Sequence, residues 1–522
     1  MGGMTTSEAA KEHTAVLVVG GGVTGLSAAL FLARQGIRPI LVERHPDTAI
    51  LPQARAFNPR TMEIYRALGL EQRIRDRTSL LAGFPEMIGA ETLLGEERFR
   101  FDLLAQVRPP EGLSPTDWAL VDQDDLERIL RAEAEDRGAD VRFGTELVSL
   151  DSGADGVHAV VRDAAGGEYG IDADYVVAAD GNRAGIRHRL GIGAERMGPS
   201  GHVVYFVFDA DLEDALRGRR FTLAYLDRPT KGTVLVPLRT FGRWMLGSPY
   251  DPAADQKPED FTEEHCVALA REAVGDPDLA VSIVPPVPGW SQTVSHSTIG
   301  AWVADSYRAG RVFFAGDSAH VMPPSGSYGA STGIADAHNL AWKLAAVIYG
   351  QAPDTLLDTY ENERRPVAQL TVRTAVQLLH SRQQETGEGI DDITMIFGYR
   401  YASDTPLEDP REPSGRPGSR APHVWLDRDG EKVSTVDLFT GSFTLLAGPD
   451  GAGWAAAAAA LGLDFHRIGT DPDDRFTRGY GITRSGATLV RPDGFIAWRA
   501  ATLPELPEER LRQALRHATI GR

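Results

Sequence analysis

The stretch Ala15–Glu43, AVLVVGGGVTGLSAALFLARQGIRPILVE, decides the fold of this chain. Its apolar run Ala15–Val19 predicts a buried strand of a parallel sheet. Leu26–Gln35 has the apolar spacing of a helix, and Gly36 stands where a helix commonly ends. A second strand is expected over Arg38–Val42. The stretch therefore predicts one β-α-β unit.

The turn between the first strand and the helix carries the pattern G-x-G-x-x-G. Gly20, Gly22 and Gly25 permit a tight turn, the close approach of a pyrophosphate, and close packing of helix on strand. Glu43 follows about 20 residues later, where an acid can hold a ribose hydroxyl. A glycine-rich turn without a ligand is the alternative. Because strand, glycines, helix, strand and acid occur in register, we expect a ligand that contains adenosine diphosphate.

Composition and charge exclude several classes of function. The 522 residues should form two or three domains. A net charge of −19 argues against a nucleic-acid or anionic-membrane partner. Cys266 is the only cysteine, so no intrachain disulfide can form, and no cluster of histidines indicates a metal. No apolar run is long enough to span a membrane, and the first 13 residues lack the layout of a signal peptide. We therefore expect a cytoplasmic protein.

The middle of the chain changes from parallel to antiparallel character. Alternating runs at Val203–Asp209, Phe221–Tyr225, Thr233–Pro237 and Arg243–Gly247 predict an antiparallel sheet that covers a substrate. Arg311–Ala315 is again a buried strand, and it ends at Asp317. A glycine-rich loop then leads into a helix from about Thr332, and a long helix follows from Asp354 to about Glu385.

Three separated motifs give the chain a family resemblance. They are the glycine pattern Gly20–Gly25, DGNRAGIR at Asp180–Arg187, and RVFFAGDSAHVMPP at Arg311–Pro324, which STGIADAHNLAWKL at Ser331–Leu344 continues. With them the chain resembles the FAD-dependent aromatic hydroxylases, the single-component monooxygenases related to para-hydroxybenzoate hydroxylase. Its end, which includes SGATLVRPDGFIAWR, looks like the thioredoxin-like appendage of polyketide-tailoring members.

The resemblance implies an α/β fold with a Rossmann-type FAD-binding domain, an inserted antiparallel substrate domain and a C-terminal thioredoxin-like domain. The expected parts are listed by residue number: 1–190 and 301–402 for FAD binding, 191–300 for the substrate, 403–421 as a linker, and 422–522 as the thioredoxin-like domain. The last part contains no cysteine, which excludes thiol–disulfide exchange there.

The implied activity is hydroxylation of a phenolic or polycyclic aromatic ring in antibiotic biosynthesis. It would use non-covalent FAD, NADPH or NADH as transient reductant, and molecular oxygen through a flavin hydroperoxide. Other oxygenations on the same scaffold, such as epoxidation, Baeyer–Villiger reaction or oxidative decarboxylation, stay open, as does a non-catalytic flavin-binding protein. A homodimer also stays open.

The candidate cofactor residues lie in these motifs and in the loops beside them. Asp317 follows a buried strand, as a carboxylate would if it accepted a ribityl hydroxyl, although a turn would also use Asp. The helix that begins near Thr332 presents free N–H groups and a positive dipole end, which suit the anionic edge of reduced flavin. The resemblance adds Asp180. The full list is Gly20, Gly22, Val23, Thr24, Gly25, Glu43, Arg44, Arg55, Gln123, Asp180, Asp317, Pro324, Gly329, Ala330, Ser331 and Thr332.

No catalytic residue can be named from the sequence, because this chemistry needs no protein nucleophile. The chain has to exclude water, orient the ring and manage the phenol proton. The substrate-domain candidates, for which ordinary structural roles are the alternative, are His202, Tyr205, Arg220, Tyr225 and Trp244. The sequence departs from the resembled family at Ala184, Tyr328 and Ser331.

Overall fold

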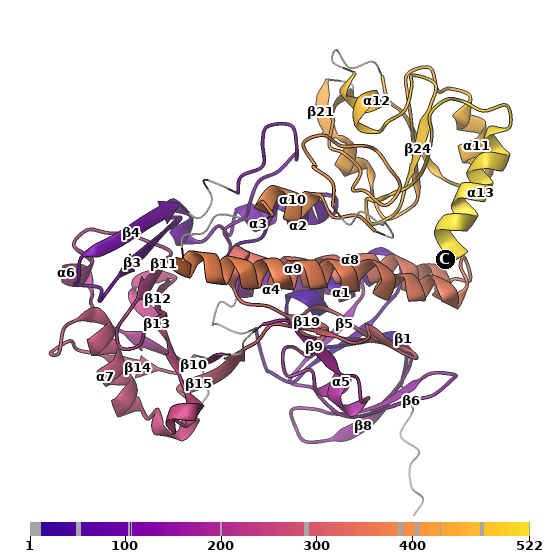
Figure 1. Ribbon diagram of the computed structural model, residues 1–522. Coiled ribbons are helices and arrows are strands. Elements are labelled where there is room, and N and C mark those ends of the chain that lie inside the picture. The colour runs from indigo at the N-terminus through magenta and orange to yellow at the C-terminus, as the bar shows by residue number, and fades with distance from the viewer. Residues whose placement is uncertain are drawn as a thin grey trace, which may run out of the picture.

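The structure is a computed structural model of the chain (Figure 1). It describes residues 12–48, 54–102, 105, 107–198, 201–286, 292–384, 390–401, 407–428, 430–469 and 474–520. Most of the N-terminal segment in which we looked for a signal peptide, and residues 403–406 of the expected linker, lie outside these ranges. Within them, no helix combines the length and the apolar character that a membrane crossing requires.

The first sheet is mainly parallel and has the order β17-β18-β8-β1-β2-β5. Its strands are β1 (Glu12–Val19), β2 (Ile40–Glu43), β5 (Asp140–Phe143), β8 (Glu168–Ala178), β17 (Arg308–Ala309) and β18 (Val312–Phe314), with β6 (Glu146–Ser152) and β7 (Val157–Arg162) added antiparallel on β8. The burial pattern of β8 changes along its length. Buried and half-buried residues alternate from Ile171 to Asp174, whereas Tyr175–Ala178 are all buried. One half pairs with the β6–β7 hairpin and the other is buried in the sheet, so a single strand carries both patterns.

Helices cover this sheet and connect its strands. They are α1 (Val23–Arg34), α2 (Pro59–Arg66), α3 (Glu71–Arg75), α4 (Gln123–Asp136), α5 (Gly185–Arg189), α8 (Gly329–Ile348), α9 (Asp358–Gln384) and α10 (Asp392–Phe397). Asn58 caps α2, because its side chain accepts the Thr61 N–H and Pro59 follows at the first helical position. Helix α9 runs across the whole molecule, past the second sheet at one end and the first sheet at the other (Figure 1).

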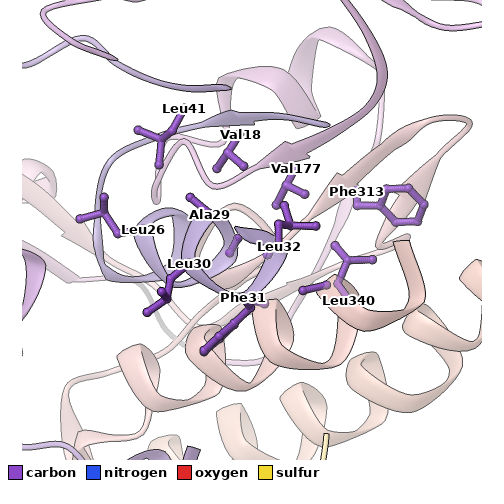
Figure 2. Close-up of a cluster of buried hydrophobic side chains, with 14 of the residues drawn as sticks. Val18, Leu26, Ala29, Leu30, Phe31, Leu32, Leu41, Val177, Phe313 and Leu340 are labelled. Carbon is purple, nitrogen blue, oxygen red and sulfur yellow. The ribbon is translucent and has the colours of Figure 1, made fainter. Parts of the chain in front are cut away.

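The largest apolar core lies between α1, α8 and the parallel sheet (Figure 2). Ala29 and Leu32 of α1 lie beneath Val18 of β1 and Val177 of β8 in this view, and Leu340 of α8 lies beside Leu32. All five are at most 4% exposed. The tight packing of α1 against α8 fixes where both helices begin.

The second sheet is antiparallel except at one pair of strands, and its order is β14-β10-β13-β12-β11-β3-β4. Its strands are β3 (Glu86–Ala90), β4 (Glu97–Asp102), β10 (Gly201–Asp209), β11 (Leu223–Leu226), β12 (Thr233–Leu238), β13 (Thr240–Tyr250) and β14 (Ser282–Val284), with β15 (Val294–Ile299) paired to β10. The β3–β4 hairpin joins it beside β11, a long-range pairing that the sequence analysis did not anticipate. The helices of this part are α6 (Glu213–Leu216) and α7 (Glu263–Val274).

Short elements complete the main body. A small sheet has the order β19-β16-β9, with strands β9 (Ala194–Arg196), β16 (Trp302–Ala304) and β19 (His320–Val321). The 3₁₀ turns are η1 (Leu80–Gly83), η2 (Pro252–Ala254), η3 (Pro258–Asp260), η4 (Gly316–Ser318), η5 (Ser325–Ser327) and η6 (Asp354–Leu357).

The C-terminal part has a four-stranded sheet of order β23-β22-β24-β25. Strand β22 is parallel to β23 and antiparallel to β24, and β24 is antiparallel to β25, which is the strand pattern of a thioredoxin-like fold. Its elements are β20 (Trp425–Arg428), β21 (Glu431–Ser434), η7 (Thr435–Leu438), β22 (Thr444–Ala447), α11 (Trp454–Ala460), β23 (Asp464–Arg467), α12 (Arg475–Gly479), β24 (Ala487–Val490), β25 (Ile496–Ala500) and α13 (Pro507–Ile520). This part lies over α8, α9 and α2 (Figure 1).

Candidate cofactor and active site

The glycine loop at the end of β1 leaves no space for side chains at two positions. Gly20 has a φ of +112°, and a Cβ there would lie 2.1 Å from the carbonyl oxygen of Ala179. A Cβ on Gly25 would lie 1.9 Å from the carbonyl oxygen of Gly20. Gly22, in contrast, is exposed at the tip of the loop. The loop thus packs tightly inward and presents bare backbone outward, as a pyrophosphate site requires.

Glu43 lies at the carboxyl end of β2 against this loop. Its carboxylate accepts the Gly21 N–H at 2.7 Å and the His45 N–H at 2.8 Å, and the His45 ring also contacts it. Burial opposes ionisation, but these hydrogen bonds lower the pKa of Glu43. An ionised acceptor therefore stands beside the glycine loop. Arg44 follows it and is exposed.

Arg55 and Gln123 border the same region from the loop before α2 and from the first turn of α4. Gln123 Oε1 accepts the Ala54 N–H at 3.0 Å. Arg55 donates to Asp122 at 2.9 Å and to the carbonyl oxygen of Pro237 at 3.0 Å. Its remaining nitrogen Nη2 is buried and has no hydrogen-bond partner in the part of the chain that the structure describes.

Asp180 follows β8, next to the glycine loop. Its Oδ2 accepts the Ile186 N–H at 2.9 Å, whereas Oδ1 is buried with no partner among the described residues. Burial raises the pKa of its carboxyl. In the same motif, Arg187 is buried and donates to the carbonyl oxygens of Ile192 and Gly193, so its side chain has a structural use.

Asp317 lies in the η4 turn after β18. Its side chain is exposed, although residues 312–316 and 318–320 around it are buried. Desolvation by the surrounding protein nevertheless raises the pKa of this carboxyl, and His320 opposes the shift. The carboxyl of Asp317 is therefore open to solvent although the turn that carries it is buried.

The N-terminal end of α8 completes the site. The first hydrogen bond of this helix joins the Thr332 N–H to the Tyr328 carbonyl oxygen at 2.8 Å, so the N–H groups of Gly329, Ala330 and Ser331 have no acceptor within the helix. Ser331 and Thr332 are buried, and the Asn58 N–H lies 3.5 Å from Ser331 Oγ. Pro324 is exposed before η5.

Close packing brings these elements together. A Cβ on Gly316 would lie 2.5 Å from Thr24 Oγ1, and a Cβ on Gly333 would lie 2.4 Å from the same atom. Thr24 of α1 therefore touches both the η4 turn and the first turns of α8. The glycine loop, Asp180, Asp317 and the start of α8 all meet at the carboxyl end of the parallel sheet, where α/β folds bind their ligands.

A buried ion network that the sequence analysis missed holds this arrangement. Asp336 of α8 accepts the Gly316 N–H at 3.1 Å, His320 Nε2 at 2.7 Å and Arg364 Nε at 2.7 Å. All three side chains are at most 1% exposed. Burial opposes ionisation, but Arg364 and His320 lower the pKa of Asp336. The signal was present as a charged residue in the middle of an apolar helix, but its partners lie far away in the sequence.

The residues present fit an FAD molecule. The loop offers backbone to a pyrophosphate, Glu43 offers an ionised acceptor, and a helix N-terminus offers free N–H groups. Two buried polar atoms, Arg55 Nη2 and Asp180 Oδ1, lack partners within the described ranges. Buried polar groups are nearly always satisfied, so partners outside the protein are expected for both.

The second sheet presents an apolar face away from α7. Val207, Val236 and Leu238 are buried on this face, whereas Trp244 lies on the opposite face in the core with α7. Tyr205 and Tyr225 alternate with core residues and so share the first face. A Cβ on Gly247 would lie 2.9 Å from the Tyr205 ring, so this glycine lets the ring lie close to the sheet.

The remaining substrate-domain candidates are less suited to contact a substrate. Trp244 is fully buried and donates to the Ala210 carbonyl oxygen at 3.2 Å. Arg220 is bound by Glu213 at 3.0 Å and lies over the Phe241 ring. His202 packs on Tyr250 near the end of β10.

Two family models match nearly all of the chain. The FAD binding domain matches residues 13–375, and the C-terminal domain of aromatic-ring hydroxylases matches residues 414–521. A curated relative, the tetracenomycin A2 monooxygenase-dioxygenase of Streptomyces glaucescens, is 42% identical and covers 97% of this chain and 96% of its own length. The 4-methyl-5-nitrocatechol 5-monooxygenase of a Burkholderia species is also 42% identical, with 96% of both chains covered.

A solved structure has the same fold over its whole length. The complex of aklavinone-11 hydroxylase with FAD and aklavinone has a TM-score of 0.87 and 38% sequence identity, and the match covers 98% of this chain and 99% of that one. These findings confirm the expected fold class and the resemblance that the three motifs carried.

Proposed function

The chain belongs to the FAD-dependent aromatic-ring hydroxylases, and we propose that its substrate is a phenolic, polycyclic aromatic polyketide. Its cofactor is FAD, with NAD(P)H as reductant. When reduced, the flavin supplies the chemistry that inserts one oxygen atom into an electron-rich ring, and we propose molecular oxygen as the source of that atom.

Different residues of the chain would bind different parts of FAD. Glu43 would accept a hydroxyl of the adenosine ribose, and the exposed backbone at Gly22 would approach the pyrophosphate. Asp317 would accept a ribityl hydroxyl from its exposed place in the η4 turn. The free N–H groups at the start of α8 would face the pyrimidine edge of the ring, which is anionic when reduced. FAD would also supply hydrogen-bond partners for the two buried polar atoms Arg55 Nη2 and Asp180 Oδ1.

The proposal of a polycyclic substrate rests on the apolar face of the second sheet. Val207, Val236 and Leu238 are buried there although they lie away from the core with α7. A large planar ring system that packs against such a face removes its own apolar surface from water, which contributes about 25 cal/mol per Å². Tyr205 and Tyr225 add aromatic edges with hydroxyl groups that can bind a phenol or a quinone oxygen.

Substrate binding tests this proposal directly. The FAD-loaded protein is titrated with aklavinone, a tetracyclic phenol, and with single-ring para-hydroxybenzoate, and flavin absorbance is recorded. We expect micromolar or tighter binding of the tetracyclic compound and at least tenfold weaker binding of the single ring. A preference for the single ring would contradict the proposal and favour a monocyclic phenol, which the Burkholderia relative supports as second candidate.

The type of oxygenation has its own test. After turnover under ¹⁸O₂, hydroxylation adds one labelled oxygen and leaves the ring system intact. An inserted ring oxygen, an epoxide or the loss of carbon dioxide would place the chain among the alternative oxygenases. Unlabelled product would refute molecular oxygen as the source.

We further propose that the protein acts as a homodimer in the cytoplasm. NAD(P)H, the reductant of this family, is available in that compartment. Light scattering of the FAD-loaded protein measures the mass directly, and a value near 56.5 kDa, the mass of one chain, would contradict the dimer. Fractionation of the producing cells tests the compartment.

A further inference from the structure

A second carboxyl group, that of Glu127, lies at the glycine loop beside Glu43. Glu127 belongs to α4 and is only 2% exposed. Gln123 Nε2 donates to its Oε1 at 2.8 Å, and a Cβ on Gly22 would lie 3.8 Å from the same oxygen. The backbone N–H of Val23 also donates to this carboxyl. The group therefore borders the exposed tip of the loop.

Glu127 is a buried acid without a compensating cation. No salt bridge to it occurs between the residues described here. The nearby arginines are engaged elsewhere: Arg55 binds Asp122, while Arg128 and Arg239 bind Asp124.

The groups that face Glu127 come from three elements. Helix α1 contributes the uncharged backbone of Gly22 and Val23, β2 contributes the carboxylate of Glu43, and α4 itself contributes Asp124 and Gln123. Burial, with Asp124 and Glu43 adding to it, raises the pKa of Glu127 to about 8, although the hydrogen bonds of Gln123 and Val23 oppose the shift. Glu43 is shifted the opposite way. Two neighbouring carboxyls thus differ in protonation at neutral pH, a pattern that assigns them different roles.

We propose that Glu127 is a further cofactor-binding residue, a neutral carboxylic acid that donates its hydrogen to the adenosine diphosphate half of FAD. The proposal rests on the proposed FAD-binding role of the glycine loop. An ionised Glu127 would repel the pyrophosphate and could only accept hydrogen bonds, whereas the neutral acid can donate one. The negative charge of the bound pyrophosphate in turn favours the protonated form. FAD binding and protonation of Glu127 are therefore linked.

The linkage has a definite sign. FAD binds the protonated form, so affinity is full below the pKa of Glu127 and is lost as the pH rises through about 8. For one linked proton, the dissociation constant of FAD rises about tenfold between pH 7 and pH 9. Between pH 6 and pH 7 it stays nearly constant.

The experiment measures FAD binding to the apoprotein from the quenching of flavin fluorescence at pH 6, 7, 8 and 9. Glu127→Gln keeps a hydrogen-bond donor of the same shape but cannot titrate, so we expect a dissociation constant that does not change with pH. Glu43→Gln serves as the matched control: we expect weaker binding at every pH and a rise that is retained but begins at a lower pH, because the charge of Glu43 no longer helps to raise the pKa of Glu127. Circular dichroism of each apoprotein over the same pH range shows that the variants are folded.

Two outcomes would overturn the assignment of Glu127. One is a wild-type dissociation constant that stays flat from pH 7 to pH 9. The other is an equal rise in Glu127→Gln, which would trace the dependence to other groups. Failure of the folded wild-type protein to bind FAD at any pH would instead contradict the role of the glycine loop itself.

Discussion

Replacement of Arg491 by Met should weaken the attachment of the C-terminal part to the helices beneath it. Arg491 follows β24 and is 8% exposed. It donates to both carboxylate oxygens of Glu363 on α9, at 2.6 and 2.8 Å, and to both of Asp493, at 3.0 and 2.6 Å. Methionine keeps much of the volume of the side chain and removes all four charged hydrogen bonds.

The size of the loss in stability depends on the hydrogen bonds that Glu363 and Asp493 keep in the variant. Glu363 retains Lys343 at 2.7 Å and Asn339 at 2.8 Å, so this carboxylate stays partly compensated. Asp493 retains Asn339 at 3.2 Å as its side-chain donor and is 1% exposed. Removing one partner of a buried ion pair costs about 3–5 kcal/mol. Protonating an ordinary Asp at pH 7 costs about 4 kcal/mol and limits the loss, so we expect about 3–4 kcal/mol.

Urea unfolding followed by tryptophan fluorescence measures the loss in free energy of unfolding. Arg484→Met is the matched control, since it removes an arginine of the same part whose pair with Asp450 is about half exposed, and water screens such pairs so that they stabilise little. Limited proteolysis should cut Arg491→Met, but not the control, between the FAD-binding and C-terminal parts. A loss no larger than that of Arg484→Met would refute the reasoning.

Three further predictions concern the cofactor and the C-terminal part. Glu43→Ala should weaken FAD binding by about 1.5–3 kcal/mol, the value of one charge-assisted hydrogen bond, and an unchanged dissociation constant would exclude it as the ribose acid. Asp317→Ala should lower FAD occupancy, read from flavin absorbance, while the melting temperature of the apoprotein is unchanged; full occupancy would remove the ribityl role. Burial lowers the pKa of His423 to about 4, so the unfolded chain binds its proton first and stability falls on acidification from about pH 6.5 towards 4. His423→Asn, which can keep the hydrogen bond to Ser434, should lose less stability over this range, and equal losses would contradict that source of acid sensitivity.

The local half of the site could be predicted from the sequence. Strand, glycine loop, helix and Glu43 lie within 29 consecutive residues, so their geometry follows from short-range sterics and apolar periodicity. The roles proposed for Glu43 and Asp317 remain predictions, because no cofactor contact has been measured for either. The family resemblance, which rested on three separate motifs, is confirmed by the matches over the whole chain.

The features that could not be predicted depend on contacts between residues far apart in the sequence. The β3–β4 hairpin joins a strand more than 120 residues away, and no pattern within 86–102 specifies that partner. Glu127 could not be singled out from the sequence, because its burial depends on α1 packing against α4. Asp336 was likewise hidden, since its partner Arg364 lies on another helix. The chemistry of Glu127 and Asp336 depends on their burial. Apolar periodicity predicts which face of a helix is buried, but it does not predict which residues cover that face.

The ion network of the C-terminal part links it to the cofactor region through one rigid helix. Asn339 and Lys343, which bind Glu363 together with Arg491, lie on α8, whose first turn includes Ser331 and Thr332 of the candidate site. A second buried cluster joins Arg420 to Glu63 of α2, and the Asn58 cap of α2 in turn approaches Ser331. Buried ion pairs with the C-terminal part therefore hold α8 and α2, the two helices that border the flavin end of the site. A thioredoxin-like fold without cysteines cannot carry out thiol–disulfide exchange, and we infer that its buried arginines serve the helices instead: they hold in place the helices on which the cofactor would rest.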